Sequence, residues 1–113
     1  MKVGIVSPKN GEVVGRAIEQ VASIMTSYKF ELFTQDTFQP KYVSEKSLDA
    51  VIFEGSNVSD ESFAVAVKRH VSVPVFYLSQ GKVQSQLDGI EVYHIVGQQG
   101  LIPMLAHLAE VLK

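Results

Sequence analysis

The sequence predicts a single α/β domain in which a doubly wound, five-stranded parallel sheet lies between two layers of helices. Short apolar segments alternate five times with segments of helical spacing or loop composition. Connections of this length favour parallel strands joined by right-handed crossovers. The chain has 113 residues, the size of one domain with its own core, so we assign residues 1–113 to one domain.

The first elements are a strand, a helix and a second strand. Lys2–Val6 is short and rich in β-branched residues, and the loop composition of Ser7–Gly11 ends it. From Glu12 to Tyr28, apolar residues recur at steps of three and four, which predicts an amphipathic helix. Phe30–Phe33 is typical of a second strand.

The middle of the chain is predicted to hold a short helix, a buried strand and a longer helix. Thr34–Ser47 contains Pro40, so we expect a loop with a short helix after the proline. Asp49–Phe53 is apolar after its first residue, which indicates burial on both faces. Ser59 is expected to cap a helix that runs to about His70, with acidic residues in its first turn.

Two further strands and a final helix complete the predicted fold. Val73–Leu78 is the expected fourth strand and Ile90–Val96 the fifth. Between them, the polar segment Ser79–Gly89 has only two apolar residues at helical spacing, so we expect a short or distorted helix there. Leu101–Lys113 is strongly apolar and predicts the final helix.

Composition and charge exclude several classes of function. Apolar residues make up 46% of the chain and charged residues 19%, which is typical of a globular protein. The sequence has no cysteine, and its three histidines lack metal-ligand spacing, so we expect no metal and no cofactor. A net charge of −2 argues against non-specific binding of nucleic acid. No apolar run reaches the roughly 18 residues of a membrane span and the N-terminus has no signal-peptide layout, so we expect a cytoplasmic protein without a membrane partner.

Ligands of such folds bind at the carboxyl ends of the strands, and there the sequence resembles a known family. Tyr93–Leu101 (YHIVGQQGL) aligns without a gap with the D-Y-I-V-K-P-F-D-L stretch of the receiver domain of two-component response regulators. Val73–Ser79 is similar to the family's fourth strand, and Leu48–Glu54 to its third. The resemblance covers essentially the whole chain and implies a flavodoxin-like, receiver-like arrangement of the five strands.

The resemblance also implies where the family's phosphorylation chemistry would lie. Glu54 stands in place of the aspartate that takes the phosphoryl group. Ser7 and Pro8 replace the acidic pair that binds Mg²⁺, and Gly97 replaces the lysine that contacts the phosphoryl oxygens. Only Ser79 matches the family. One carboxylate without the lysine supplies too little charge to hold Mg²⁺ and neutralise a transferring phosphoryl group, so we expect no catalytic residue and no phosphotransfer.

Three of these positions allow more than one interpretation. Glu54 either imitates a phosphorylated aspartate permanently or is a solvated loop carboxylate. His94 takes the family's aromatic switch position, where it would move between buried and exposed states, or it is a histidine at the edge of a strand. Ser7–Gly11 (SPKNG) weakly resembles the phosphate loop of flavodoxins, but it lacks that loop's threonines, and Glu12 places negative charge where a phosphate would bind.

The final helix carries more apolar surface than docking on a sheet requires. At about 100° per residue, four leucines form a central stripe that faces the sheet: Leu101, Leu105, Leu108 and Leu112. Ile102 and Ala109 flank this stripe on one side, and Met104 and Val111 flank it on the other. The resemblance implies that one flank, with the edge of the fifth strand, forms a homodimer contact. The alternative is a helix whose broad apolar footprint is buried.

These observations predict a receiver-like domain for signal reception and dimerisation that works without phosphorylation. The resemblance implies that it belongs to a transcription regulator whose DNA-binding domain lies outside this chain, and Lys113 falls where a linker would begin. Two alternatives stay open. One is a stand-alone adaptor that binds a signalling protein, and the other is a flavodoxin-like domain that binds a small molecule.

Overall fold

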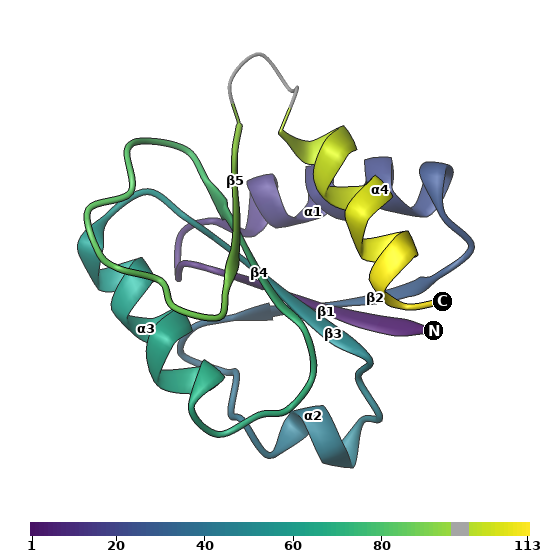
Figure 1. The fold of residues 1–113 in the computed structure, drawn as a ribbon, viewed down its shortest axis with the longest axis horizontal. Helices are drawn as coiled ribbons and strands as arrows, with labels where there is room; N and C mark the ends of the chain where they lie inside the picture. The colour runs from purple at the N-terminus through teal and green to yellow at the C-terminus, as the bar shows by residue number, and fades with distance from the viewer. Residues whose placement is uncertain (96–99) are drawn as a thin grey trace.

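The computed structural model describes residues 1–95 and 100–113 and contains one five-stranded sheet (Figure 1). All four strand pairs are parallel, and the strand order is β2-β1-β3-β4-β5. The strands are β1 (Lys2–Ser7), β2 (Lys29–Thr34), β3 (Ala50–Gly55), β4 (Val75–Ser79) and β5 (Glu91–His94). This topology confirms the predicted doubly wound parallel sheet.

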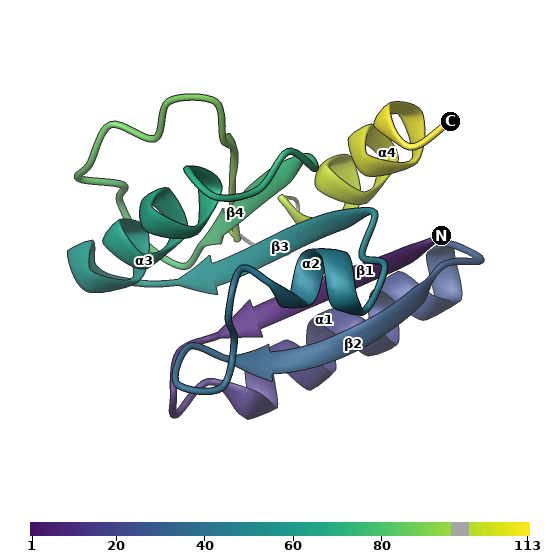
Figure 2. The ribbon, with the colours of Figure 1, turned by 90° about the horizontal axis from the view of Figure 1, so that it is seen from below.

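Helices cover both faces of the sheet, so the predicted three layers are present (Figure 2). The helices are α1 (Glu12–Met25), α2 (Tyr42–Glu45), α3 (Val58–Lys68) and α4 (Leu101–Val111). One core cluster joins α1 and α4 to the sheet through Ile18, Leu105 and their neighbours. A second cluster joins α3 and the α2 region to the other face through Ala64 and Phe38.

Strand β3 forms the centre of both cores because all of its residues are buried. Successive side chains of a strand point to opposite faces. Accordingly, Ile52 belongs to the cluster with α1 and α4, whereas Val51 and Phe53 belong to the cluster with α3. Burial on both faces is what the apolar run of this strand predicts.

The amino-terminal end of α3 differs by two residues from the prediction. Asn57, not Ser59, is the N-cap, and its side-chain oxygen accepts a hydrogen bond of 2.9 Å from the backbone N–H of Asp60. The Asp60 carboxylate in turn accepts a bond of 2.9 Å from the Ser56 N–H. These two hydrogen bonds satisfy one free donor in the first turn of α3 and the N–H of Ser56 before it, and they tie the turn after β3 to the helix.

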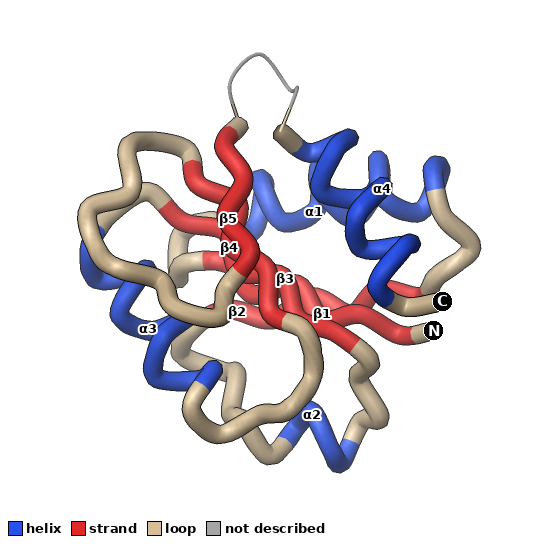
Figure 3. Tube along the Cα trace, viewed as in Figure 1, coloured by secondary structure: helices blue, strands red, loops and turns tan. Residues whose placement is uncertain are grey.

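The connection between β4 and β5 contains no helix, so the predicted short helix is wrong. A buried carboxylate organises this connection in its place. Glu61 of α3 accepts a hydrogen bond of 2.7 Å from the Ser85 N–H, and the Gln84 N–H lies 3.2 Å from each of its oxygens. Glu61 thereby ties Gln84 and Ser85 of this connection, which Figure 3 draws as a loop, to α3.

Met104 is buried, so its assignment to a dimer contact outside the core is wrong. Met104 is 0% exposed and belongs to the core cluster that contains Ile18 and Ala22 of α1. Helix α1 lies beside α4 on the same face of the sheet, so more of α4 is covered than its central leucine stripe (Figure 1). Of the other residues assigned to a dimer contact, Ile102 and Val111 are exposed and Ala109 is half-buried.

Truncation of α4 side chains should distinguish its buried flank from its exposed flank by the stability that each substitution costs. Met104→Ala should lower the free energy of unfolding by about 2 to 5 kcal/mol, since it removes fully buried atoms and leaves a cavity. Ile102→Ala should change it by no more than about 0.5 kcal/mol, because this side chain is half exposed. Urea unfolding followed by circular dichroism measures both, and equal losses would contradict the assigned burial.

Removal of the Glu61 carboxylate should release the β4–β5 connection. Glu61→Ala leaves two backbone N–H groups without an acceptor and should cost about 1 to 3 kcal/mol. Hydrogen exchange at the amides of Gln84 and Ser85 should accelerate, while amides in β1 keep their relative protection. Glu110→Ala, at an exposed position on α4, is the matched control. Unchanged exchange at both loop amides would show that Glu61 does not hold this segment.

Candidate functional site

Three of the predicted site residues lie at the carboxyl edge of the sheet. Ser7 ends β1, Glu54 is the penultimate residue of β3, and Ser79 ends β4. The strand register pairs Gly55 with Ser79, so the ends of β3 and β4 are level. Pro8 follows Ser7 in the loop to α1, and Gly97 lies outside the described residues.

Glu54 is buried, so its interpretation as a solvated loop carboxylate is wrong. The residue is 1% exposed, and its Oε2 accepts a hydrogen bond of 2.7 Å from the Nε2 of Gln80. Its Oε1 is buried and has no hydrogen-bond partner among the described residues. A Cβ at Gly11 would lie 2.5 Å from this oxygen, so the carboxyl group reaches the start of α1 across the space that glycine leaves.

The pKa of Glu54 is raised above its ordinary value of 4.5, chiefly because burial disfavours the charged form. The Gln80 and Ser7 side chains oppose this shift, and the charge of Asp60 adds to it. Among the described residues, neither of the two ion pairs involves Glu54. An amide group is therefore the direct partner of this carboxyl group in place of a cation.

A second group of buried polar side chains lies on the α3 side of β3. Asp60 is 5% exposed and accepts a hydrogen bond of 2.8 Å from the Nε2 of Gln35. The Tyr77 hydroxyl is buried without a hydrogen-bond partner in the part of the chain that the structure describes, and a Cβ at Gly55 would lie 2.5 Å from it. Burial and the charges of nearby acids raise the pKa of Tyr77. These buried side chains pack closely around the end of β3.

Ser79 and His94 share one backbone acceptor after β4. The Ser79 hydroxyl donates to the carbonyl oxygen of Gly81 at 2.6 Å. The Nδ1 of His94 lies 3.3 Å from the same oxygen, and His94 is exposed at the end of β5. The structure thus places His94 in the exposed position and directs the Ser79 hydroxyl into its own loop.

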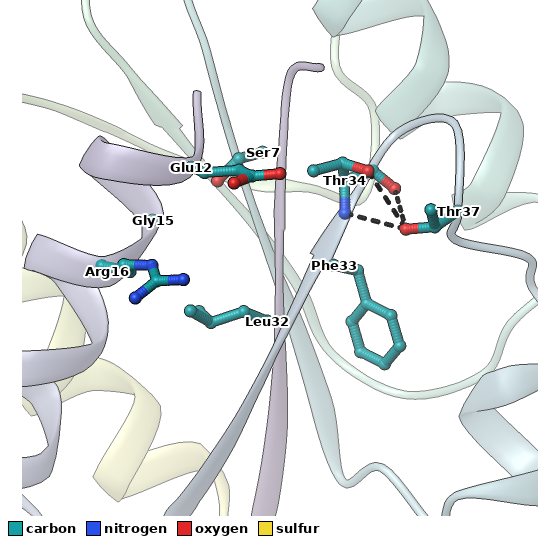
Figure 4. A pocket seen from close by; sticks show the side chains of 8 residues that line it. All are labelled: Ser7, Glu12, Gly15, Arg16, Leu32, Phe33, Thr34 and Thr37. Atoms are coloured by element: carbon teal, nitrogen blue, oxygen red, sulfur yellow. Dashed lines mark hydrogen bonds between the residues drawn. The ribbon is translucent and has the colours of Figure 1, made fainter. Parts of the chain in front are cut away.

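A pocket of about 280 Å³ lies beside this edge, between α1 and β2 (Figure 4). Its lining residues are Ser7, Glu12, Gly15, Arg16, Leu32, Phe33, Thr34 and Thr37. Arg16 and Glu12 reach it from α1, whereas the Thr34 N–H donates to the Thr37 hydroxyl at 3.1 Å on the opposite wall. The pocket combines one cation, one carboxylate and several hydroxyl groups.

The residues present do not fit the cofactors that related folds suggest. In the described part of the chain, no three histidine or acidic side chains gather in a way that would hold a metal ion. A flavin phosphate would need the free amino-terminal end of α1. The Glu54 carboxyl group reaches that end at Gly11, and Glu12 places a carboxylate in the first turn.

Sequence reasoning identified the strand ends but missed how their side chains pair. Gln80 lies at a predicted strand end, yet nothing in its spacing indicates a bond to Glu54, 26 positions earlier. Gly11 was assigned only to a loop, although the Glu54 carboxyl group fills the space above it. Asp60 and Glu61 follow a predicted turn, but their burial depends on loops packed over them.

Comparison with known proteins supports the fold and leaves the family open. No family model matches the chain, and no curated protein matches it significantly in sequence. An orphan response regulator of H. pylori has a similar structure, with a TM-score of 0.62 and 19% identity over 100% of this chain and 97% of that one. A flavodoxin variant from Pseudomonas aeruginosa has a TM-score of 0.59 and 14% identity, and 99% of each chain is covered. At these identities the likeness shows a flavodoxin-like fold.

The described helices were also compared with the length and hydropathy of a membrane span. None of them is both long enough and apolar enough to cross a bilayer.

Replacement of Glu54 by glutamine should change how stability depends on pH. A carboxyl group with a raised folded-state pKa contributes its full stability below 4.5 and loses it as the pH rises through the folded-state value. Glu54→Gln cannot ionise and keeps a carbonyl oxygen for the Gln80 amide. The unfolding free energy of Glu54→Gln, minus that of the wild type, should therefore increase from pH 4 to pH 8.

Urea unfolding of both proteins at several pH values measures this difference. Glu110→Gln, on the exposed face of α4, serves as the control and should show no comparable trend. A constant difference between Glu54→Gln and the wild type would mean that Glu54 ionises as readily in the folded state as in the unfolded state.

Proposed function

We propose that this chain is a receiver-like regulatory domain that acts without phosphoryl transfer. The observation that carries the proposal is the state of Glu54. Its carboxyl group is buried at the phosphorylation position and is hydrogen bonded to Gln80, next to a loop that lacks acidic residues between Ser7 and Gly11. A receiver that is phosphorylated needs an accessible carboxylate and a bound Mg²⁺ at this place.

The geometry around Glu54 disfavours phosphoryl transfer to its carboxyl group in two ways. Attack on a phosphoryl donor requires the carboxylate oxygen to approach phosphorus in line, and both Glu54 oxygens face protein groups. Charge neutralisation requires cations held at the transferring group, and neither ion pair of the described chain involves Glu54. We therefore assign Glu54 a permanent structural role that replaces the transient phosphoryl group.

The proposal includes the wider role that the family resemblance implies. The domain would receive a signal in the cytoplasm and form a homodimer, and it would serve a transcription regulator. DNA binding would belong to a domain outside these 113 residues. A domain locked in one chemical state transmits a signal through binding or assembly, since its phosphorylation position cannot change.

The predicted dimer contact through α4 and β5 needs revision within this proposal. Met104 is part of the core, which leaves Ile102 and Val111 as the large exposed apolar residues of α4. These two side chains lie about 180° apart around the helix at 100° per residue. One flat contact can therefore use only one of them.

The flavodoxin-like alternative is less well supported. The pocket beside β2 has a suitable place in the fold, but the Glu54 carboxyl group occupies the space at the start of α1 and the Glu12 carboxylate in the first turn repels a phosphate. Purified protein should show no visible absorption band after incubation with flavin mononucleotide and gel filtration. A stoichiometric band would favour this alternative over the receiver-like role.

Incubation with a small phosphodonor tests the central proposal. The whole chain, treated with acetyl phosphate and Mg²⁺, should keep its intact mass, because Glu54 is enclosed and the charges that support transfer are absent. A phosphorylatable receiver domain treated in parallel is the positive control. The addition of one phosphoryl group that maps to Glu54 would overturn the proposal.

A further inference from the structure

Helix α1 has an exposed apolar stripe that nothing in the described chain covers. Val13 is 80% exposed and Ile24 is 86% exposed, more than any other large apolar side chain among the described residues. Ala17 and Gln20, between them, are also exposed. At about 100° per residue, these four residues lie within about 60° of one another around the helix. Val13, Ala17, Gln20 and Ile24 are called the α1 stripe below.

The α1 stripe lies on the outer side of a helix that is already fully docked. The inner side of α1 buries Gly15, Ile18 and Ala22 against the sheet. The stripe extends about 16 Å along the axis at 1.5 Å per residue, which matches the contact length of a second helix. The small side chain of Ala17 near its middle permits the close approach of another helix.

The charges beside the stripe favour a second copy of the same helix in the antiparallel direction. Arg16 and Glu19 lie together on one flank, and neither forms an ion pair in the described part of the chain. A two-fold axis midway between residues 18 and 19 places Val13 opposite Ile24 of the other copy. The same operation places Arg16 of one copy beside Glu19 of the other, and their positions along the helix axis differ by only about 3 Å.

We infer that this protein forms a homodimer by antiparallel packing of its α1 stripe against the same stripe of a second copy. The contact pairs Val13 with Ile24 twice and places two Arg16–Glu19 pairs along one side. This surface differs from the α4 and β5 contact that the family resemblance implies. The inference rests on the dimerisation part of the proposed function and assigns that dimer to a surface.

The contact predicts a weak dimer. Two crossing helices bury less than the about 1,200 Å² of a standard interface, so the dissociation constant should be high. Sedimentation velocity of the whole chain over a concentration series measures it. Ile24→Glu should raise the dissociation constant by about tenfold or more, because it places a charge in the apolar contact. The fold should be unaffected, since this side chain is almost fully exposed.

Two control variants identify the surface. Val58→Glu substitutes an exposed valine of α3, on the opposite face of the sheet, and should leave the dissociation constant unchanged. Ile102→Glu tests α4 and should also leave it unchanged. A dimer that resists Ile24→Glu but is weakened by Ile102→Glu would overturn the α1 assignment while the proposed dimerisation stands.

Charge exchange tests whether the partner is a second copy in the stated orientation. Arg16→Glu alone and Glu19→Arg alone should each weaken the dimer, and the double exchange should restore it, because the pairs reform with reversed sign. Failure of the double exchange to restore association would overturn the antiparallel arrangement. A wild type that stays monomeric at the highest concentration would overturn both this inference and the proposed dimerisation. The absence of phosphoryl transfer is tested separately, by the intact mass of the chain.

Discussion

The burial of the Glu54 carboxyl group, with an amide as its direct partner, is the constraint on which the rest of the site depends. A carboxyl group away from water needs either a cation or hydrogen-bond donors. Gln80 supplies one donor, and the missing side chain of Gly11 makes room for the other oxygen beside α1. These two contacts join the ends of β3 and β4 to the β1–α1 loop. The region that is open in a phosphorylatable receiver is therefore closed here, and no ion pair forms at Glu54 among the described residues.

The fold could be predicted because its signals are local. The apolar run of β3 indicates burial on both faces, and the helical spacing after Glu12 indicates α1, without knowledge of any distant residue. The errors occur where distant elements decide the outcome. Met104 is buried because α1 lies beside α4, a fact that a single helix projection does not contain. The connection after β4 has no helix, and Glu61, more than 20 residues earlier, accepts hydrogen bonds from two of its backbone N–H groups.

The position of the site could be predicted from the sequence, but the burial and the hydrogen bonds of its side chains could not. The carboxyl ends of parallel strands meet at one edge, so Ser7, Glu54 and Ser79 were correctly placed near each other. Whether Glu54 is solvated depends on atoms from three separate segments, and one sequence does not rank these arrangements. Residue type was informative in a different way. The missing acidic pair and lysine indicate which chemistry is absent, whereas the Gln80 contact indicates what stabilises the carboxyl group in its place.

The connection between β4 and β5 has a consequence for how this domain can diverge. A helix at this place would pack a hydrophobic face on the sheet and would constrain both its length and its sequence. Residues 80–90 are instead anchored at a few points, since Glu61 binds the backbone at Ser85, Gln80 binds Glu54 and Ile90 packs in the core. Most of the segment is exposed. Surface loops of this kind accept insertions and deletions with little loss of stability. Homologues of this chain can therefore lengthen or recompose the connection, and acquire new binding surfaces there, while the sheet and both cores stay as they are.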